Sequence, residues 1–393
     1  MICLKGNKIN IDREYLMRVK KIDTFQIREE SYLIYLLTNQ RSVLEFPFEA
    51  LYLTNSEDPS IIPQFKNKHI IYGINDLAVL QVGDVVLVNA QGEIIISYQR
   101  ISNDNVLFVT QKCNCDCIMC PQPPDKEIKE YMKLNFELIR LMDKKTKYLA
   151  LTGGEPTLNK NNLIKIIKEC KKYLPSTSLI LLTNGINFED FDFTKELILI
   201  SHPDLTIAIS LQSDIDEINN MMMGKAVFYK ILKGIYNLAR FQQKIEIRTV
   251  VTKLNFQRLP NFAEFVSYNF PFVYHVAIMG LEPVGNALKN INKLWVDPYT
   301  YQDILRKTVQ IFHRRDMNVS IYNHQLCILH NSLWRFSKNS ISEWKNIYLD
   351  TCERCDYKNN CGGLFTSSND IHSNFIHPLT KEKSYSEFYY KMH

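Results

Sequence analysis

Residues 113–120 read Cys113-Asn114-Cys115-Asp116-Cys117-Ile118-Met119-Cys120 and follow the apolar run Val106–Thr110. Cys113, Cys117 and Cys120 have the spacing C-x3-C-x2-C, which lets one short loop place three thiolates at three corners of an iron–sulfur cubane. A 4Fe–4S cluster has four irons, so three protein ligands leave one iron open to a small molecule. The loop therefore predicts an open iron–sulfur site.

The same loop has simpler interpretations. Tightly spaced cysteines in a chain without a secretory signal are more often metal ligands than disulfides. Zinc prefers paired C-x2-C knuckles that close a tetrahedral site, whereas this loop offers one knuckle and an offset cysteine. Spacing and soft ligands therefore favour iron–sulfur over zinc. Cys115 is an additional thiol inside the loop, and we interpret it as a bystander rather than a ligand.

Composition limits the classes of function. The 393 residues are enough for two or three domains, one of them with a large core. The 47 basic and 42 acidic residues give a net charge of +5, too small to argue for binding to nucleic acid or a membrane surface. No apolar run approaches the ~18–20 residues that cross a bilayer, and residues 1–6 lack the apolar core of a signal peptide. Ten cysteines then predict a reducing, cytoplasmic location, where thiolates stay available for metal.

Residues 1–105 are a predicted N-terminal β-rich domain. Turn signals around Gly83 and Gly92 separate three β-rich stretches, Leu77–Val82, Val85–Asn89 and Ile94–Tyr98, as in a small antiparallel unit built from hairpins. The stretch carries no motif with chemistry of its own, so we expect it to cover one end of the catalytic domain or to grip a partner.

Residues 106–316 alternate apolar strands with helical patterns. Six strand–helix units of this kind predict an α/β fold, in which a parallel sheet curls into an open, partial (β/α)6 barrel of the TIM type. In such folds the chemistry lies on loops at the carboxyl ends of the strands, where the motifs below fall. The predicted strands are Val106–Thr110, Tyr148–Thr152, Leu179–Thr183, Thr206–Leu211, Glu246–Val251 and Tyr274–Met279, and the predicted helices are Leu163–Tyr173, Val227–Phe241, Leu259–Tyr268 and Tyr301–Arg315.

The second predicted strand leads into the segment Thr152-Gly153-Gly154-Glu155-Pro156. Two adjacent glycines let the backbone approach a ligand closely, and its carbonyl groups can accept hydrogen bonds from an ammonium group. A Gly-Gly turn by itself is more often only a tight loop. Placed one strand after the cysteine loop, the segment resembles the GGEP motif of radical S-adenosylmethionine (SAM) enzymes. The cysteine loop, with an apolar residue before its last cysteine, resembles the signature of the same superfamily.

This resemblance implies a 4Fe–4S cluster on Cys113, Cys117 and Cys120 that binds SAM, with the SAM amino group at the GGEP motif. Arg248 is a charge between apolar strand residues and needs a partner, for which the SAM carboxylate is the natural choice. Thr183 and Asn184 are expected to contact the SAM ribose. Alternatively, they only cap the turn ahead of Gly185. The implied SAM-binding residues are Met119, Gly153, Gly154, Glu155, Pro156, Thr183, Asn184, Ser210, Gln212, Arg248 and, on the adenine side, Gly280.

A second group of cysteines lies in residues 317–393, the predicted C-terminal extension. Cys352, Cys355 and Cys361 have the spacing C-x2-C-x5-C, and Cys327 stands upstream, so four thiolates are available to close a metal site. Four cysteines in two groups also describe a structural zinc site. The run resembles the SPASM and shorter twitch domains of peptide-modifying radical SAM enzymes, although Phe365 replaces the next cysteine of a full SPASM run. The resemblance implies one auxiliary 4Fe–4S cluster, which we favour over zinc.

Three further stretches, Cys117–Pro124, Met279–Pro283 and Ser340–Asn346, resemble the radical SAM maturases of the His-Xaa-Ser peptide systems. This resemblance implies an enzyme that cleaves SAM reductively to a 5′-deoxyadenosyl radical and abstracts hydrogen from a ribosomally made precursor peptide, forming a cross-link or related modification. It also implies a companion radical SAM protein and a reductant such as flavodoxin or ferredoxin, but no nucleic acid or membrane partner.

Two other functions stay open at this point. In the first, the chain is a non-catalytic, cluster-bearing scaffold for the companion enzyme. The intact SAM-binding loops argue against this function. In the other it is a radical SAM enzyme that acts on a nucleoside or small metabolite. The small net charge argues against RNA, and the twitch-like C-terminal region favours a peptide.

Overall fold

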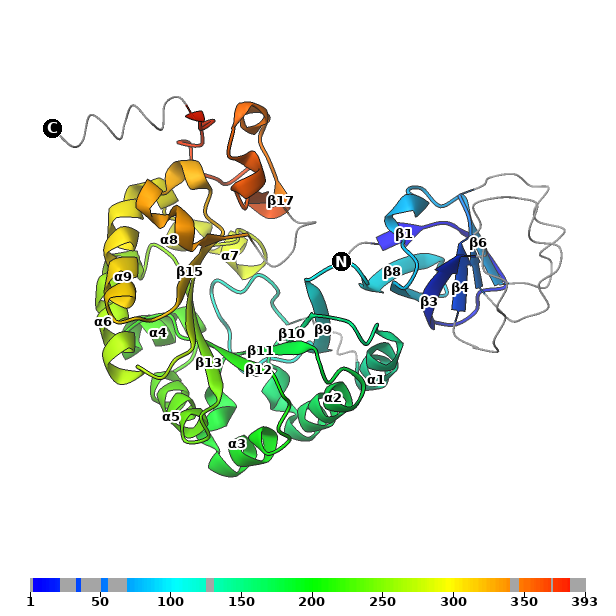
Figure 1. The fold of residues 1–393 in the computed structure, drawn as a ribbon, viewed down its shortest axis with the longest axis horizontal. Coiled ribbons are helices and arrows are strands. Elements are labelled where there is room, and N and C mark those ends of the chain that lie inside the picture. The colour runs from blue at the N-terminus through cyan, green and yellow to red at the C-terminus, as the bar shows by residue number, and fades with distance from the viewer. Residues whose placement is uncertain are drawn as a thin grey trace.

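The structure is a computed structural model that describes residues 3–21, 33–36, 51–55, 69–124, 131–339, 346–368 and 370–381. Residues 340–345, which carry part of the His-Xaa-Ser resemblance, lie outside the described residues. The described strands form two eight-stranded sheets and one two-stranded sheet. Figure 1 shows the second eight-stranded sheet curved into an open arc, with helices along its outer side.

The curved sheet has the strand order β16-β15-β14-β13-β12-β11-β10-β9, and every neighbouring pair is parallel. The predicted α/β fold with a curled parallel sheet is thereby confirmed. The strands are β9 (Asn105–Thr110), β10 (Tyr148–Gly153), β11 (Ser178–Thr183), β12 (Leu205–Ser210), β13 (Lys244–Val251), β14 (His275–Gly280), β15 (Val319–Tyr322) and β16 (Ser337–Lys338).

The predicted count of six strands is too low for this sheet. The six predicted strands correspond to β9–β14, but β15 and β16 extend the sheet beyond β14. Both follow residue 316, where the sequence placed the end of the barrel. They have four and two residues, which is too short for a clear alternation of apolar and polar positions.

Helices cover the convex side of the curved sheet. In α5, buried residues at helical spacing, Phe228, Ile231, Ile235 and Leu238, form one apolar face. The helices are α1 (Met132–Leu141), α2 (Lys160–Tyr173), α3 (Phe191–Ile198), α4 (Asp216–Met223), α5 (Phe228–Ala239), α6 (Leu259–Asn269), α7 (Asn286–Lys289), α8 (Ile291–Leu294) and α9 (Gln302–Arg314).

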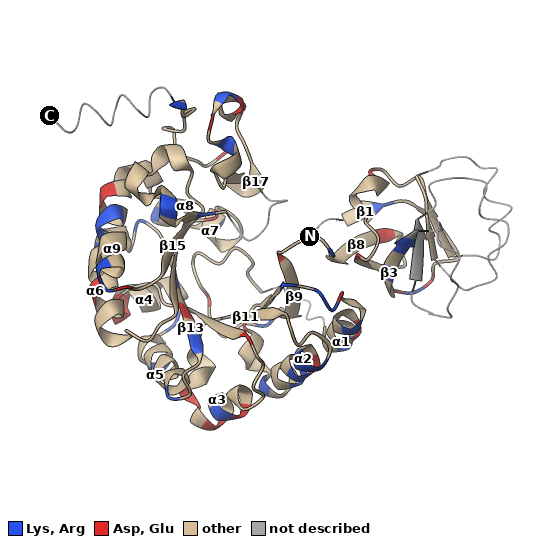
Figure 2. Ribbon diagram, viewed as in Figure 1, with Lys and Arg blue, Asp and Glu red and all other residues tan. Residues whose placement is uncertain are grey.

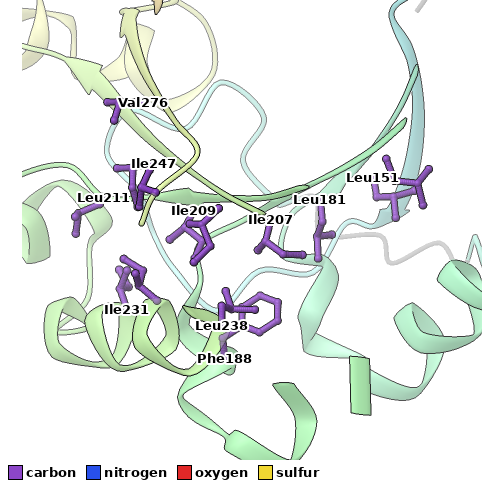
Figure 3. Close-up of a cluster of buried hydrophobic side chains, with 14 of the residues drawn as sticks. Leu151, Leu181, Phe188, Ile207, Ile209, Leu211, Ile231, Leu238, Ile247 and Val276 are labelled. Carbon is purple, nitrogen blue, oxygen red and sulfur yellow. The ribbon is translucent and has the colours of Figure 1, made fainter. Parts of the chain in front are cut away.

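The core lies between the sheet and these helices. Figure 3 shows Leu181, Ile207 and Ile209 from neighbouring strands facing Phe188 and Leu238. Because side chains alternate across a strand, the intervening residues point to the concave side of the sheet. Figure 2 shows coloured bands on β13 where its charged residues lie. Glu246 and Arg248 alternate there with the core residues Ile245 and Ile247, so they lie on the concave side.

The N-terminal sheet is β-rich as predicted, but it is not purely antiparallel. β3 pairs in parallel with β4, which pairs in parallel with β5 and then β6. The predicted strand Leu77–Val82 is also wrong, because Leu77–Val79 forms a 3-10 helix. The strand order is β1-β8-β7-β3-β4-β5-β6-β2, with β1 (Cys3–Lys5), β2 (Asn7–Ile9), β3 (Tyr15–Lys21), β4 (Leu33–Leu36), β5 (Leu51–Leu53), β6 (His69–Tyr72), β7 (Val85–Val88) and β8 (Glu93–Tyr98).

The N-terminal sheet contacts the first helix of the barrel and the loop that follows it. The Arg18 guanidinium donates to the carbonyl oxygen of Leu141 at 2.9 Å. The Tyr98 and Thr146 hydroxyls lie 2.8 Å apart and are both buried. This places the sheet beside α1, and the division of the chain at residues 105 and 316 stays a prediction.

The chain after β15 consists mostly of 3-10 turns. Its short strands β17 (Asn346–Ile347) and β18 (Leu364–Phe365) pair antiparallel. In the view of Figure 2, acidic and basic residues are interspersed over the outer helices. Among the described residues, no helix combines the length and the apolar character needed to cross a membrane.

Candidate functional site

The cysteine loop follows β9 and packs tightly against the Gly-Gly turn after β10. The backbone N–H groups of Gly154 and Glu155 donate to the carbonyl oxygens of Thr110 and Lys112 at 2.8 and 2.7 Å. A Cβ on Gly154 would collide with the Lys112 carbonyl group. The glycine is therefore required for the close approach of the two loops, directly before Cys113.

Loops from the other half of the barrel hold the opposite side of the cysteine loop. Gly224, in a left-handed conformation after α4, touches the Asp116 backbone so closely that no Cβ fits. The Asn286 side chain donates to the Cys117 carbonyl at 3.2 Å, and its backbone N–H donates to the Cys120 carbonyl at 2.9 Å. Asn290 donates to the Ile118 carbonyl at 3.1 Å. The loop is irregular, so these donors take the place of secondary-structure hydrogen bonds.

The three predicted cluster ligands lie on this clamped loop and are each partly exposed. Burial raises the pKa of the Cys113 thiol to about 11 and also raises the pKa of Cys120. A hydrogen bond with Cys115, together with burial, raises the pKa of Cys117, to which the charges of Cys113 and Cys120 add. Since the coordinating form is the thiolate, iron binding here must release protons.

Three soft sulfur donors on one loop fit an iron–sulfur cluster with an open iron. Within the described residues, no three His, Cys, Asp or Glu side chains converge as ligands of a single metal ion. A cubane binds each cysteine at a different iron, so its ligands need not gather around one point. Cys115 is buried, and Asn184 donates to its sulfur at 3.7 Å, which agrees with a position inside the loop's packing.

Glu155 is completely buried, and protein donors occupy both of its carboxylate oxygens. Oε1 accepts from the backbone N–H and the hydroxyl of Thr157 at 3.0 and 2.6 Å and from the Thr183 hydroxyl at 2.7 Å. Oε2 accepts from the Asn184 backbone N–H at 2.7 Å. Burial raises the pKa of this carboxyl group, while these hydrogen bonds oppose the rise. The Glu155 side chain thus joins the turn after β10 to the end of β11. The predicted contact with the SAM amino group then falls to the backbone of Gly153 and Gly154.

Thr183 and Asn184 lie at the end of β11, as predicted, beside the cysteine loop. The Asn184 side chain donates to Asn114 Oδ1 at 2.7 Å. Thr183 accepts from the Gly185 backbone N–H at 3.0 Å, which is the turn cap that the sequence offered as an alternative. Ribose contact by these two residues stays a prediction.

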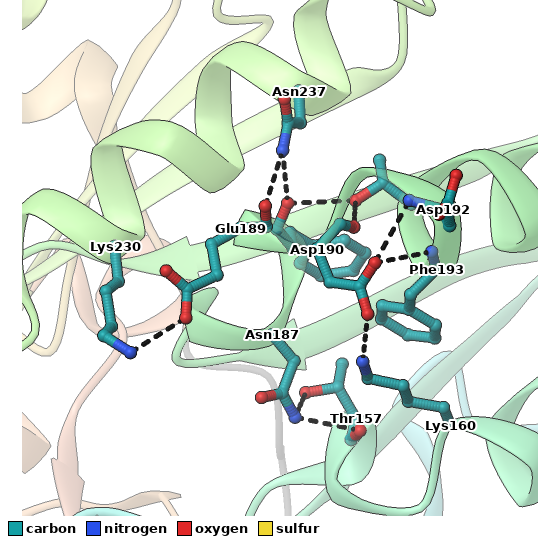
Figure 4. A network of polar contacts seen from close by, with 11 residues as sticks. Thr157, Lys160, Asn187, Glu189, Asp190, Asp192, Phe193, Lys230 and Asn237 are labelled. Atoms are coloured by element: carbon teal, nitrogen blue, oxygen red, sulfur yellow. Dashed lines mark hydrogen bonds and ion pairs between the residues drawn. The ribbon is translucent and has the colours of Figure 1, made fainter.

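A polar network outside the loop reinforces the same turn. Figure 4 shows Asn187 donating to Thr157, at 3.0 Å to its carbonyl oxygen and 3.1 Å to its hydroxyl. Asp190 caps α3 and forms an ion pair with Lys160 at 2.5 Å. The turn with Pro156, which is buried at the start of a 3-10 helix, is therefore connected to α2 and α3.

Of the other predicted SAM contacts, Gln212 is buried and links strands. Its Oε1 accepts from the Val250 backbone N–H at 2.9 Å, and its own backbone N–H donates to Asn219 at 3.0 Å. Ser210 is partly exposed at the end of β12, where it pairs with Arg248 on β13. The Arg248 guanidinium lies 3.6 Å from Glu246, so in this structure its charge is compensated within the protein.

Met119 and Gly280 complete the predicted set. Met119 is buried in the main hydrophobic core, as an anchoring apolar residue of the loop would be. Gly280 ends β14, lines a pocket of about 390 Å³ and lies against the carbonyl group of Asn323.

The C-terminal cysteines meet around one cavity. Cys327, Cys352, Cys355 and Cys361 all line a pocket of about 400 Å³, together with Ile347, Leu364, Leu379 and other residues. Burial, together with the charges of Cys361 and Cys352, raises the pKa of the Cys327 thiol to about 11. The Leu379 backbone N–H donates to the Cys355 sulfur at 3.4 Å. Four thiols separated by up to 34 positions are thus brought together.

Sequence reasoning missed the residues that hold the cysteine loop from the far side of the barrel. Gly224, Asn286 and Asn290 are examples, and Lys225 donates to the Asn114 carbonyl at 2.9 Å. Asn286 and Asn290 are four positions apart, a spacing that places two side chains on one helical face. That spacing is common, and nothing in it points to a loop about 170 positions away.

The sequence profile of the radical SAM superfamily matches residues 107–266. Uncharacterized protein MJ0907 of Methanocaldococcus jannaschii is 32% identical over 179 residues, which cover 42% of this chain and 58% of that protein. GTP 3′,8-cyclase of Campylobacter jejuni is 34% identical over 178 residues, 43% of this chain and 52% of the cyclase. The chain thus spans about half the length of these curated relatives.

The structure shares its fold with a solved structure. The structure of anSMEcpe with bound AdoMet and Kp18Cys peptide has a TM-score of 0.51 and 16% identity, over 72% of this chain and 95% of that one. SuiB of Streptococcus suis bound to SAM has a TM-score of 0.46 and 17% identity, over 55% of this chain and 49% of that one. Residues 107–266 thus match the radical SAM superfamily in sequence, and the curled sheet is shared with anSMEcpe in fold.

Proposed function

We propose that this chain modifies a ribosomally made precursor peptide of the His-Xaa-Ser type, forming a cross-link or related modification. Radical SAM enzymes use a 4Fe–4S cluster and SAM, and in this chain Cys113, Cys117 and Cys120 would hold that cluster. When bound, the cluster supplies the electron that cleaves SAM to methionine and a 5′-deoxyadenosyl radical.

The residues of the chain position these groups. The Gly153–Gly154 backbone would accept hydrogen bonds from the SAM amino group, and Arg248 would bind its carboxylate once it turns from Glu246. Glu155 and Asn184 hold the Gly-Gly turn and the cysteine loop in place through their hydrogen bonds. We assign these two as positioning residues, in place of direct contact with SAM.

The observation that carries the peptide assignment is that Cys327, Cys352, Cys355 and Cys361 line one pocket. Four sulfur donors around one pocket suit zinc as well as an iron–sulfur cluster. The C-x2-C-x5-C spacing, which resembles that of twitch domains, favours an auxiliary 4Fe–4S cluster. Such a cluster would supply an acceptor for one electron beside the SAM site.

The space between the two sites supports a substrate there. The four-cysteine pocket and the pocket at Gly280 share Gln325 and Leu364, and a third pocket of about 310 Å³ adds Gly362 and Phe365. These cavities lead from the carboxyl end of β14 to the C-terminal cysteines. In anSMEcpe, which has the same fold, the structure contains both AdoMet and a peptide.

A second candidate function is chemistry on a nucleotide. The sequence similarity to GTP 3′,8-cyclase at 34% identity favours it, but it covers only 43% of this chain and 52% of the cyclase.

A companion radical SAM protein and a flavodoxin or ferredoxin reductant belong to the peptide proposal. A scaffold without catalysis would make no 5′-deoxyadenosine at all.

The deciding experiment uses anaerobically reconstituted full-length protein with SAM and dithionite. We expect 5′-deoxyadenosine, and in co-expression with a His-Xaa-Ser peptide and the companion protein we expect loss of two hydrogens per modified repeat by mass spectrometry. Cys117→Ala abolishes both products, whereas Cys3→Ala, at an exposed cysteine, changes neither. Consumption of GTP with an unmodified peptide would replace the peptide proposal by the nucleotide one.

A further inference from the structure

A pocket at the carboxyl ends of β14 and β15 contains a buried hydrogen-bond acceptor that the protein leaves unfilled. Asn323 directly follows β15 and lines this pocket together with Gly280, the last residue of β14. The Oδ1 atom of Asn323 is buried and has no hydrogen-bond partner among the described residues. A buried acceptor that has lost its hydrogen bonds to water and gained none in return destabilises the fold, so its presence in a pocket points to a ligand.

The orientation of the Asn323 amide is fixed by its other end. Its Nδ2 donates to the Gly280 carbonyl oxygen at 3.1 Å. A carbonyl oxygen only accepts, so exchanging the two ends of the amide would place one oxygen against another. Oδ1 is therefore the end without a partner, and only a hydrogen-bond donor can satisfy it.

The Asn323 backbone is held in a conformation that few residues adopt. Its φ is 62°, in the left-handed region, and its carbonyl oxygen would lie 2.6 Å from a Cβ on Gly280. The next residue, His324, is anchored at both ring nitrogens. Its Nδ1 donates to the Tyr322 carbonyl oxygen at 2.8 Å, and its Nε2 lies 2.8 Å from the Tyr301 hydroxyl. These contacts hold the amide in one place, as expected of a group that is preorganised for a ligand.

The pocket lies between the two groups of cysteines. On one side, the segment that leaves β14 lines the pocket at Leu281 and contacts the cysteine loop at Gly285, where a Cβ would lie 2.7 Å from the Cys120 carbonyl oxygen. On the other side, the pocket shares Gln325 and Leu364 with the pocket of the C-terminal cysteines. A substrate bound here would therefore lie between the predicted SAM site and the predicted auxiliary cluster.

The remaining lining indicates which kind of group the acceptor would meet. Trp295, Val296, Pro298 and Ile371 give the pocket apolar and aromatic walls. Among the described residues, no Lys, Arg, Asp or Glu side chain lines it, so the pocket offers no charge to pair with a triphosphate. Apolar walls exclude water and strengthen a hydrogen bond inside the pocket. A neutral N–H group on an apolar body fits this lining best.

We propose that Asn323 recognises the peptide substrate by accepting a hydrogen bond from one of its N–H groups at Oδ1. The inference rests on the proposed function, which supplies the peptide, and it names the residue that orients this peptide between the two cysteine sites. Both the backbone amide and the imidazole of a His-Xaa-Ser peptide carry such an N–H group. Asn323 is thus a specificity residue, which favours a donor at this point of the substrate.

The test measures how two ligands bind to the anaerobically reconstituted holoenzyme. Fluorescence anisotropy of a labelled synthetic His-Xaa-Ser peptide gives the Kd of the peptide, and equilibrium dialysis gives the Kd of SAM. Asn323→Gly removes the acceptor and keeps the left-handed backbone, which glycine adopts freely. We expect the Kd of the peptide to rise about tenfold, as for the loss of one buried hydrogen bond, and the Kd of SAM to stay at the wild-type value.

A matched control makes the same change at the opposite end of the barrel. Gln242 also carries a side-chain amide and has a left-handed backbone, with a φ of 55°, but it is exposed and precedes β13. Gln242→Gly should leave the Kd of the peptide and the Kd of SAM unchanged.

A second peptide identifies the donor. Replacing its histidine by thiazolylalanine keeps a five-membered ring with a ring nitrogen and removes the N–H group. If the imidazole is the donor, this peptide binds the wild type about tenfold more weakly than the parent peptide, whereas the two peptides bind Asn323→Gly equally. If a backbone amide is the donor, the replacement has the same effect on both proteins.

Three outcomes overturn the inference. If the wild type and Asn323→Gly bind the peptide equally and the wild type modifies it, the proposed function stands and the peptide does not use this acceptor. If Asn323→Gly binds SAM more weakly, the residue supports the SAM site or the fold instead. If the wild type binds no peptide, the proposed function and the inference fail together.

Discussion

The two cysteine groups of this chain are built in different ways. The loop that contains Cys113, Cys117 and Cys120 is held by backbone and side-chain donors from three other parts of the barrel. Cys327 and Cys352 lie on 3-10 turns, and Cys355 and Cys361 each follow such a turn directly. The strands described for residues 346–368 have two residues each. Protein contacts thus shape the first site, whereas regular structure contributes little to the shape of the second.

The difference has a physical origin. A site that must leave one iron open needs a loop whose geometry does not depend on a complete ligand set. A site closed by four cysteines can gain much of its folding energy from the bonds to metal. Under the proposed function, the comparison therefore separates a preorganised loop from a four-cysteine site that metal binding would help to fold.

The largest expected effect comes from removing one cysteine at each site. Cys117→Ala should abolish 5′-deoxyadenosine formation, whereas Cys355→Ala should keep it and lose peptide modification. Iron content should fall from about eight to about four per chain in each variant, because each cubane holds four irons. Iron analysis and chromatography of the products check this. Equal loss of 5′-deoxyadenosine in both variants would remove the functional distinction between the sites.

Removal of metal should affect the two regions unequally. In chelator-treated protein we expect amide hydrogen exchange to become fast in residues 346–368 and to stay slow in β10–β13. The four-cysteine region has little packing of its own, while the barrel strands lie in the main core. Mass spectrometry of exchanged peptides measures the difference. Unchanged protection of residues 346–368 would mean that protein contacts alone shape the second site.

Acid should lower the free energy of unfolding through His324, which lies between β15 and Cys327 and so links the barrel to the C-terminal cysteines. Burial lowers the pKa of this histidine from 6.5 to about 4, and its Nε2 lies 2.8 Å from the Tyr301 hydroxyl. The neutral form stabilises the fold fully above pH 6.5, and this contribution is lost as pH falls toward about 4. The shift corresponds to about 3 kcal/mol of unfolding free energy.

Denaturant unfolding between pH 7 and 4 measures this loss. His324→Gln should flatten the profile in that range, and a variant that keeps the full slope would assign it to other groups. His313→Gln, on the surface side of α9, is the control and should leave the slope unchanged.

A smaller effect is expected from one added methyl group. Gly154→Ala places a Cβ against the Lys112 carbonyl, and overpacking of this kind costs about 1–3 kcal/mol. Gly362→Ala, beside the C-terminal site, meets no atom nearer than 3.5 Å and should be tolerated. Thermal unfolding of the two variants checks the contrast. Similar melting temperatures would show that the first loop adjusts more easily than its contacts imply.

Much of the barrel could be predicted from local patterns. β9–β14 are buried apolar runs, and α2, α5, α6 and α9 have apolar residues at helical spacing, so each is visible in a short window. The four residues of β15 give too little alternation to predict a strand. The apolar residues Leu77–Val79 favour a strand in the sequence, although they form a 3-10 helix. Register and pairing in the N-terminal sheet were beyond reach, because β3 finds its parallel partner β4 only in the folded sheet.

The candidate sites divide in the same way. The spacing of Cys113, Cys117 and Cys120 is encoded within eight residues, and so is the Gly-Gly turn, because both motifs are local. The use of Glu155 as an internal acceptor and the support of the cysteine loop by Asn286 depend on contacts between distant segments, which a linear pattern does not contain.

Local spacing along the chain was enough to specify the cluster loop, the strand and helix alternation and the second set of cysteines. Folding alone produced the pocket that gathers those cysteines and the hydrogen bonds that join Glu246, His275 and Ser320. The reason is that side-chain alternation is a property of each strand by itself. The register that makes residues from β13, β14 and β15 neighbours arises only when the parallel strands pair.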